Sequence, residues 1–476
     1  MVVKKLDKRL LVGIKNLNYM LNANIITFFI STMVVLIIPK MIGVPEYGMF
    51  QLYIFYTSYA GFLLFGWNDG IYLRFGGYDY DRLDKTAISS QFYMSLVFQI
   101  IIFLSLLTIQ PFLLENQLSS IIIFILTSVL ITNSSGILLS TFQATNKFKQ
   151  FSISQISGRL TYIILTIIFV VQGTANFITI IVCDLIGKVI TFCVALYFSR
   201  DIVCRKISDI HFDYKEAYRN ISVGIKLMFA NIASMLIIGF VRFGIERTWD
   251  VATFGKVSLT LSISNMMMIF INAVGIIMFP ILRRTNHEKL SSIYSTMRDF
   301  LMVILLGFLI IYYPLKTIMV AWLPQYAESL LYMSLVFPIF IYEGKMALLI
   351  NTYLNTLRRE KVMLKINLFS MVLSLFITYM TTQVFVNLEL VILNIVILLS
   401  IRSVIAEYYL ARELNIKVKK DIVLELLLTT VFIVTGWFVN SWMTVVFYGI
   451  AYMCYLLIKR KDIIETSKNI KSLIKA

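Results

Sequence analysis

The sequence predicts an all-α polytopic membrane protein of about fourteen transmembrane helices, arranged as two six-helix bundles related by pseudo-symmetry plus two C-terminal helices. Three observations predict this fold: the composition, a series of apolar stretches and a weak internal repeat. Of the 476 residues, 59% are hydrophobic and 14% are charged, and the mean hydropathy is +0.83. A soluble domain averages about 45–50% apolar and about 25% charged residues. A chain with this much apolar surface belongs in a bilayer.

A membrane-spanning helix needs about 20 mostly apolar residues. The stretches that meet this requirement are 20–39, 47–68, 88–110, 118–142, 151–172, 175–198, 222–245, 252–281, 299–321, 330–356, 362–386, 388–409, 422–440 and 442–458. They divide the chain into a first bundle (1–198), a polar amphipathic linker (199–221), a second bundle (222–410) and a C-terminal part with two extra helices and a basic tail (411–476).

The basic residues predict the orientation of these helices. The chain has 43 Lys and Arg against 26 Asp and Glu, a net charge of +17. With a cytoplasmic N-terminus, most basic residues fall in cytoplasmic segments, and the opposite side, counted with the adjoining span ends, carries only Lys40, Arg247, Lys256 and Lys316. Both termini should therefore be cytoplasmic, because short cytoplasmic loops are rich in Lys and Arg. We expect no nucleic-acid binding, because the sequence lacks the aromatic and basic interleaving that stacks bases.

Short matches relate the two halves. Asn24, near the start of the first span, corresponds to Asn231 near the start of the seventh, 207 residues later. The end of the fourth span, LLSTFQATNK, matches the end of the tenth, LLINTYLNTLRR, at an offset of 211 residues. Because the first and seventh spans run in the same direction, these matches predict a parallel repeat, as in transporters whose bundles move about a site near the midplane.

Basic residues inside the spans are the candidate binding groups, because a charge at the bilayer centre costs roughly 2.5–3.5 kcal/mol and usually faces a partner or a cavity. Arg159 and Lys345 lie deep in their spans with no acid three or four positions away. We predict that both line a central cationic chamber and hold an anionic cargo, since Arg and Lys bind phosphates by charge-assisted hydrogen bonds. The alternative is that these charges serve helix packing.

Two further bases, Lys188 and Arg242, have an acid on the same helical face. Asp184 lies four residues before Lys188, and Glu246 lies four residues after Arg242. Each base can belong to the same cationic cavity or form a neutralised pair. Arg242 can also extend its stem to the membrane interface.

Glu343, Asp184 and Asp69 are candidates for charge balance or for binding a coupling cation such as H⁺ or Na⁺. Glu343 lies two residues from Lys345, and the 211-residue offset places this pair opposite the polar residues 132–134 of the fourth span. Both halves therefore carry a polar patch at matching depth. Asp69 lies in GWNDGIYLRFGG (66–77), whose glycines permit close helix approach or a break.

No pattern in the sequence indicates a catalytic residue or a metal site. The four cysteines form no C-x-x-C pair, and both histidines lie in polar loops. The sequence has no phosphate-binding G-x-x-x-x-G-K-[ST] motif, so any work must come from ion or substrate gradients. We therefore expect a transporter, not an enzyme, with no cofactor other than a coupling cation.

Three stretches resemble signatures of a known family. VLIIPKMIGVPEYGMFQLY (35–53), GWNDGIYLRFG (66–76) and LLSTFQATNKFKQFS (138–152) are similar to the first-loop, second-span and fourth-span signatures of polysaccharide flippases. With its predicted spans and cytoplasmic termini, the chain resembles Wzx-type exporters of the multidrug/oligosaccharidyl-lipid/polysaccharide (MOP) superfamily.

This resemblance implies a two-lobed helical bundle with a V-shaped cationic cavity in the bacterial cytoplasmic membrane. It implies a flippase that carries undecaprenyl-pyrophosphate-linked oligosaccharide, a repeat unit of capsule, O-antigen or exopolysaccharide, from the inner to the outer leaflet by alternating access. The implied partners are the lipid-linked oligosaccharide, membrane lipid, and a polysaccharide polymerase and glycosyltransferases. The site residues named above rest on the physical argument alone.

Two other functions stay open. A cation-coupled multidrug antiporter of the same superfamily should have acids dominating its chamber, whereas interior bases outnumber interior acids here. A membrane glycosyltransferase or polymerase should have a large outward catalytic loop, and the predicted outward loops are short.

Overall fold

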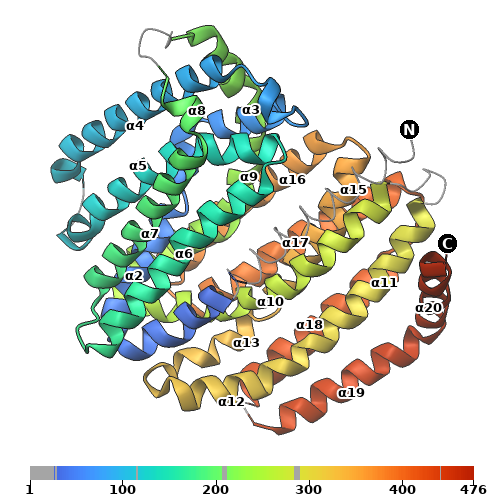
Figure 1. The fold of residues 1–476 in the computed structure, drawn as a ribbon. Helices are drawn as coiled ribbons and strands as arrows, with labels where there is room; N and C mark the ends of the chain where they lie inside the picture. Colours follow the sequence, from blue (N-terminus) through green and yellow to red (C-terminus); the bar gives the residue numbers. More distant parts are fainter. Residues whose placement is uncertain are drawn as a thin grey trace, which may run out of the picture. The chain divides into compact units, whose positions relative to one another are not determined.

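The computed structural model describes residue 26 and residues 29–113, 116–205, 212–283, 290–439 and 441–475. All regular elements in these ranges are helical, without strands (Figure 1). Ten of the described helices are long and apolar enough to cross a membrane, and a bent pair, Met443–Ile458 with Arg460–Lys468, makes an eleventh. The predicted all-α polytopic membrane fold is confirmed.

The chain forms two compact units, Met1–Ile232 and Ala233–Ala476. The division falls inside helix α9 (Tyr214–Thr248), which begins within the stretch 199–221 that the sequence predicts as a linker. A carboxylate cap explains this start, because the Asp213 side chain accepts a hydrogen bond from the main-chain N–H of Glu216 at 3.0 Å. Such a cap satisfies one of the N–H groups left open at a helix N-terminus.

The first unit contains the helices of the first six predicted spans. After the short apolar helix Phe29–Met41 come α2 (Val44–Thr57), the 3₁₀ turn Ala60–Leu64, α3 (Trp67–Arg74), α4 (Lys85–Leu113), α5 (Asn116–Ala144), α6 (Phe148–Val171), α7 (Phe177–Phe198), α8 (Arg200–Val203) and the start of α9. Asn24 lies outside the described residues, so its repeat relation to Asn231 stays a prediction.

The second predicted span is broken, not continuous. Between α2 and α3 the chain passes through two left-handed residues, Phe65 (φ 52°) and Gly66 (φ 77°). The same glycine-rich stretch packs closely on α9: a Cβ on Gly70 would lie 1.9 Å from the carbonyl oxygen of Asn220, and a Cβ on Gly224 would lie 1.9 Å from that of Gly66. The glycines therefore provide both a break and a close approach.

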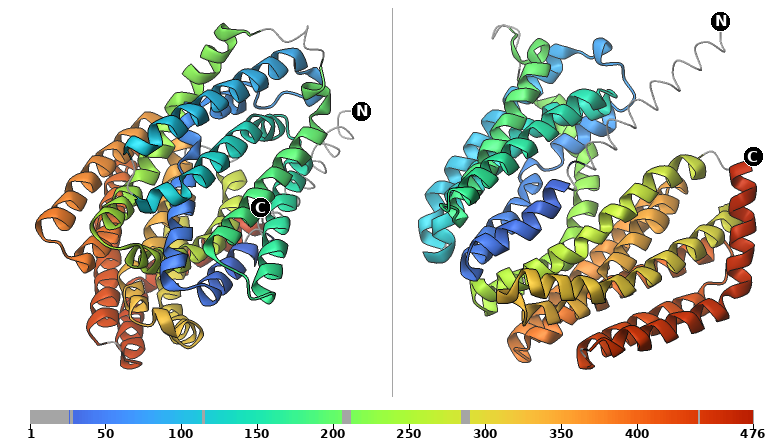
Figure 2. Two further views of the ribbon diagram at one scale, coloured as in Figure 1. Left: turned by 90° about the vertical axis from the view of Figure 1, so that its left-hand side faces the viewer. Right: turned by 60° about the horizontal axis from the view of Figure 1, so that its bottom comes forward.

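The second unit contains the other helices (Figure 2). They are α10 (Val251–Arg283), α11 (Leu290–Phe308), α12 (Tyr312–Trp322), α13 (Met333–Val336), α14 (Ile339–Lys345), α15 (Asn351–Thr356), α16 (Glu360–Tyr379), α17 (Leu388–Glu413), α18 (Lys419–Phe438), α19 (Met443–Ile458) and α20 (Arg460–Lys475). A 3₁₀ turn joins α11 and α12 into one membrane-length helix, and α20 turns away from α19 by 65°.

The segment Ser329–Thr356, formed by α13 to α15, is the most buried of the membrane-length helices that the structure describes. It is also irregular. Pro338 stands between α13 and α14, and a π-helix, Met346–Ile350, follows directly after Lys345. A proline removes one helical hydrogen bond, and π-turns inside helices occur often at functional sites. The tenth span is therefore the centre of the second unit.

Local geometry agrees with the repeat at the ends of the fourth and tenth spans. The Thr145 hydroxyl donates to the carbonyl oxygen of Thr141 at 2.7 Å, and the Thr356 hydroxyl donates to that of Thr352 at 2.8 Å. Both helices then end at left-handed residues, Asn146 (φ 58°) and Arg358 (φ 54°). That spans 1–6 and 7–12 superpose as whole bundles stays a prediction.

Candidate functional site

In the first unit, a polar cluster joins α2, α5 and α7. The Lys188 ammonium lies 2.6 Å from the Asp184 carboxylate, so the predicted pair on one helical face is formed. The Tyr53 hydroxyl of α2 donates to Asp184 at 2.6 Å, and Lys188 donates to the Ser128 hydroxyl of α5 at 2.7 Å. We call these four residues the N-unit cluster.

The N-unit cluster is partly open. The side chain of Lys188 is 27% exposed and that of Asp184 is 18% exposed. The Lys188 ammonium also lies 5.1 Å from the centre of the Tyr53 ring. An incoming anion could exchange with Asp184 for the ammonium, and an incoming cation could exchange with Lys188 for the carboxylate. The cluster therefore suits a binding step that breaks one ion pair and forms another.

Arg159 is exposed on α6 and makes no hydrogen bond or ion pair with the described residues. Its neighbour Gly158 lies at a close approach of α6 and α7, because a Cβ there would meet the carbonyl oxygen of Gly187 at 2.4 Å. The guanidinium thus belongs to the helix pair that carries Asp184 and Lys188, and it can accept an anion without first losing a partner.

In the second unit, Lys345 is fully buried and paired. Its ammonium lies 2.8 Å from Glu407 of α17 and 2.7 Å from Glu425 of α18. Arg298 of α11 completes the group, with its Nε 2.5 Å from Glu407. We call Arg298, Lys345, Glu407 and Glu425 the buried charge network. These four residues hold two positive and two negative charges, and Arg298 links them to Asp299 and Asp421, each at 3.9 Å.

The buried charge network explains how a lysine is tolerated at the centre of an apolar segment. An isolated buried charge is very costly, and ion pairing with hydrogen bonds offsets much of that cost. In this conformation the Lys345 ammonium is occupied by two carboxylates, as the packing alternative requires. That Lys345 also holds cargo stays a prediction.

Glu343 is paired with α17, the helix that also carries Glu407. Its carboxylate lies 3.0 Å from Nη1 of Arg402 on α17, and Nε of Arg402 donates to Asn367 of α16 at 3.0 Å. Arg402 is buried, while the Glu343 side chain is 25% exposed. Glu343 and Lys345 therefore have separate partners on other helices. This agrees with their spacing of two residues, because residues two apart in a helix lie on different faces.

The other predicted residues have different surroundings. Arg242 donates to the Ser258 hydroxyl at 3.0 Å and lies over the Phe254 ring at 5.1 Å. Asn231 is exposed on α9, and Asp69 is half-buried in the first turn of α3. None of these contacts tests the proposed cargo or coupling roles, which stay predictions.

Four charged residues of these groups are not recognisable from the sequence as site residues: Arg298, Arg402, Glu407 and Glu425. Arg298, Glu407 and Glu425 lie within a few residues of a predicted span end. A charge at that position is common, because the side chain can reach the membrane interface. The sequence signal that could have found them is the presence of Lys345 and Glu343 inside an apolar span, because a charge within a span calls for an opposite charge at similar depth on another span. Among the described residues, no group of three or more His, Cys, Asp and Glu is suited to hold a metal ion.

Comparisons with known proteins agree with this architecture. The structure is similar to an inward-facing multidrug resistance MATE family transporter of the MOP superfamily, with a TM-score of 0.64, 12% identity, and coverage of 83% of this chain and 94% of that one. It is also similar to the lipid II flippase MurJ in an inward closed conformation, with a TM-score of 0.64, 11% identity, and coverage of 94% and 99%. At these identities the likeness shows the fold alone.

A search of curated proteins gives no significant match. A family model described as polysaccharide biosynthesis protein matches residues 79–328, which is more than half of the chain. The resemblance inferred from the three sequence signatures is thereby confirmed at the level of family. The chain belongs to this polysaccharide biosynthesis protein family and has the fold of the MOP superfamily transporters.

Proposed function

We propose that the protein is a flippase that moves undecaprenyl-pyrophosphate-linked oligosaccharide from the inner to the outer leaflet of the bacterial cytoplasmic membrane by alternating access. The observation that supports this most is the combination of a polysaccharide biosynthesis family with the fold of a lipid II flippase. Both termini are cytoplasmic in this proposal, as the distribution of basic residues predicts.

In the proposed mechanism, Arg159 and the N-unit cluster receive the pyrophosphate. Arg159 is exposed and Lys188 is held on the neighbouring helix, so two cations are available from one unit. Each charge-assisted hydrogen bond contributes roughly 1.5–3 kcal/mol. Two such bonds hold the cargo without preventing its release. Lys345 and Arg242 would take part if their present partners exchange during the cycle.

A test in cells uses a strain whose own flippase for a lipid-linked glycan is depleted. We expect the wild-type chain to restore glycan delivery to the outer leaflet. Arg159→Ala and Lys345→Ala, made singly and together, should each lower glycan delivery. Losing one charge-assisted hydrogen bond weakens cargo binding by about tenfold or more. Arg200→Ala, which removes an exposed arginine of α8, is the control.

Protein level in the membrane is measured for each variant. If both single variants accumulate normally and deliver glycan at the wild-type rate, Arg159 and Lys345 have no role in cargo binding. If Lys345→Ala fails only through loss of protein, the packing role accounts for Lys345.

A cation-coupled multidrug antiporter is the second candidate, favoured by the equally high TM-score to a MATE family transporter. The partly open Asp184 would then receive the coupling cation. Export of a cationic dye driven by an imposed H⁺ or Na⁺ gradient, without any transfer of lipid-linked glycan, would decide for the antiporter.

A further inference from the structure

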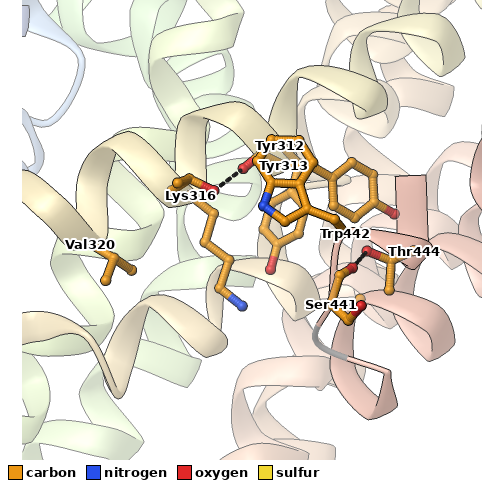
Figure 3. A pocket seen from close by; sticks show the side chains of 9 residues that line it. Tyr312, Tyr313, Lys316, Val320, Ser441, Trp442 and Thr444 are labelled. Atoms are coloured by element: carbon orange, nitrogen blue, oxygen red, sulfur yellow. Dashed lines mark hydrogen bonds between the residues drawn. The ribbon is translucent and has the colours of Figure 1, made fainter. Parts of the chain in front are cut away.

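Two cavities lie at opposite ends of α18 in the second unit. The first, of about 230 Å³, lies near Gly436, and Figure 3 shows the aromatic side chains of Tyr312, Tyr313 and Trp442 on its walls. The second, of about 340 Å³, lies at the other end of α18, near Asp421. Seven of its twelve lining residues are charged: Arg298, Asp299, Lys417, Asp421, Lys459, Asp462 and Glu465.

Lys459 gathers three of these acids around one ammonium. It is the residue between α19 and α20, where the chain bends by 65°. Its Nζ lies 2.8 Å from Asp299 of α11, 2.9 Å from Asp421 of α18 and 2.7 Å from Asp462 of α20. The Lys459 side chain is only 3% exposed. This single ammonium joins three helices, and we call these four residues the α20 clasp.

The α20 clasp holds α20 against the rest of the unit. α20, the dark red helix of Figure 1, packs on α11 and α19. Thr466, in its second turn, is only 6% exposed and lines the second cavity, whereas Lys461 and Lys468 of the same helix are exposed. Removing one partner of a buried ion pair leaves the other charge uncompensated. The clasp therefore stabilises the docked position of α20.

Two acids of the clasp have a second base nearby. Nη1 of Arg298 lies 3.9 Å from Asp299 and 3.9 Å from Asp421, which is too long for a hydrogen bond. Nη2 of Arg298 is buried without a hydrogen-bond partner, while Nε donates to Glu407. Arg298 is thus shared between the α20 clasp and the buried charge network, with donors left unused.

The charges and the space around them permit a second pairing. Together, the clasp and the buried charge network contain three bases and five acids, so acids compete for bases. A close-packed interior gives side chains no room to exchange partners. Here Arg298, Asp299, Asp421 and Lys459 all border the cavity of about 340 Å³. Asp299 and Asp421 can therefore turn from Lys459 to Arg298, where the guanidinium offers paired donors to a carboxylate.

We propose that Lys459 and Arg298 form a two-position switch that couples the docking of α20 to the buried charge network. In the docked position, which the structure shows, Asp299 and Asp421 pair with Lys459. In the released position they pair with Arg298, whose guanidinium moves away from Glu407, and α20 leaves α11. The switch is a movement within the second unit and does not depend on which substrate the protein carries.

The test measures how fast a water-soluble maleimide labels Thr466→Cys in the purified full chain, in a variant without the four native cysteines. Position 466 should react slowly while α20 is docked, because it is buried there. Lys459→Gln should raise the labelling rate by about tenfold or more, since it removes charge-assisted hydrogen bonds that hold α20. Lys461→Gln, which removes an exposed lysine of α20, is the matched control and should leave the rate unchanged.

A second arm separates a switch from a simple anchor. Glu407 is bound by Arg298 and by residues of α11 and α14, not of α20. Glu407→Gln should loosen Arg298, which then takes acids of the clasp from Lys459. The switch therefore predicts faster labelling of Thr466→Cys in this variant. Glu343→Gln, which removes an acid paired with α17, should leave the rate unchanged.

Size-exclusion chromatography checks that each variant is folded. Should Glu407→Gln fail to accumulate, Glu425→Gln replaces it with the same expectation, because Nη2 of Arg298 lies 3.6 Å from Glu425. Wild-type labelling in Lys459→Gln, or equal acceleration in Lys461→Gln, would show that the clasp does not hold α20. Unchanged labelling in the second arm, or equal acceleration in Glu343→Gln, would overturn the coupling to the buried charge network.

Discussion

Lys345 has two carboxylates within 3 Å and no solvent exposure. Removing one partner of a buried ion pair leaves the other charge uncompensated and costs about 3–5 kcal/mol. We therefore expect Lys345→Ala to lower the free energy of unfolding by that amount, measured by thermal unfolding of the purified protein in detergent.

A matched control is Lys361→Ala, which removes an exposed lysine of α16 and should change stability by about 0.5 kcal/mol or less. The double variant Lys345→Met with Glu425→Gln should recover part of the loss, because it removes a positive and a negative charge together. Equal stability of Lys345→Ala and the wild type would contradict the buried charge network.

Asp201 of α8 shows a residue-scale effect that depends on pH. Burial favours the neutral acid, but hydrogen bonds from Lys85 and Tyr80 outweigh it and lower the pKa of Asp201 below its ordinary value of 3.8. A carboxylate with a depressed folded-state pKa stabilises the fold above its unfolded pKa, and this stability is lost as pH falls through the folded pKa. The Asp201 side chain is 38% exposed, so solvent screening keeps the effect small.

We expect Asp201→Asn to lower the melting temperature at pH 7 relative to the wild type, and the difference to shrink as the pH is brought below about 4. Thermal unfolding at a series of pH values measures it. A difference that stays constant down to a pH of about 3 would show that the carboxylate charge has no part in it.

At the scale of elements, the packing of α3 on α9 depends on glycine. A Cβ on Gly224 would lie 1.9 Å from the carbonyl oxygen of Gly66 and 2.3 Å from the main-chain nitrogen of Gly70. Main-chain atoms cannot move aside as a flexible side chain can. Gly224→Ala should therefore push the helices apart and destabilise the protein by about 1–3 kcal/mol.

Gly449→Ala is the matched control, because a Cβ on this α19 glycine would have no neighbouring atom within 4 Å. Alanine is favoured over glycine in a helix by roughly 0.5–1 kcal/mol. The melting temperature should fall for Gly224→Ala and stay level or rise for Gly449→Ala. The same change in both variants would mean that the close approach has no energetic weight.

The element boundaries show what the sequence can predict. Composition and span length identify the membrane helices, because apolar length is a strong local signal. The sequence does not place the break after α2, because a glycine permits a left-handed turn without demanding one. It does not place the division inside α9 either, because the polar residues of its first turns resemble a linker until their cap is seen.

The site is predictable only in part for a related reason. The Asp184–Lys188 pair is local, and its spacing alone indicates it. The partners of Lys345 and Glu343 are 59 to 80 residues away on other helices, at Arg402, Glu407 and Glu425. Nothing in the local sequence of α14 specifies them, since tertiary packing decides which charges meet.

At the scale of the whole molecule, the predicted topology can be measured in a variant that lacks the four native cysteines. Glu360→Cys and Thr174→Cys place single thiols at exposed positions near the ends of two predicted spans. In intact cells, a membrane-impermeant maleimide should label position 174 and should reach position 360 only after permeabilisation, because the basic loops are predicted to be cytoplasmic. Labelling of position 360 in intact cells would contradict the predicted cytoplasmic location of this loop.

The central claim is that the protein transfers a lipid-linked oligosaccharide between leaflets. The most direct measurement is the transfer of a fluorescent undecaprenyl-pyrophosphate oligosaccharide between leaflets in proteoliposomes of the purified chain. A membrane-impermeant quencher, which reaches only the outer leaflet, reports how much of the glycolipid has been transferred. We predict that the chain raises the fraction of glycolipid exchanged between leaflets over protein-free liposomes, and that Arg159→Ala lowers the rate while Arg200→Ala does not. Wild-type proteoliposomes that exchange the glycolipid no faster than protein-free ones, with or without an imposed H⁺ or Na⁺ gradient, would contradict the account.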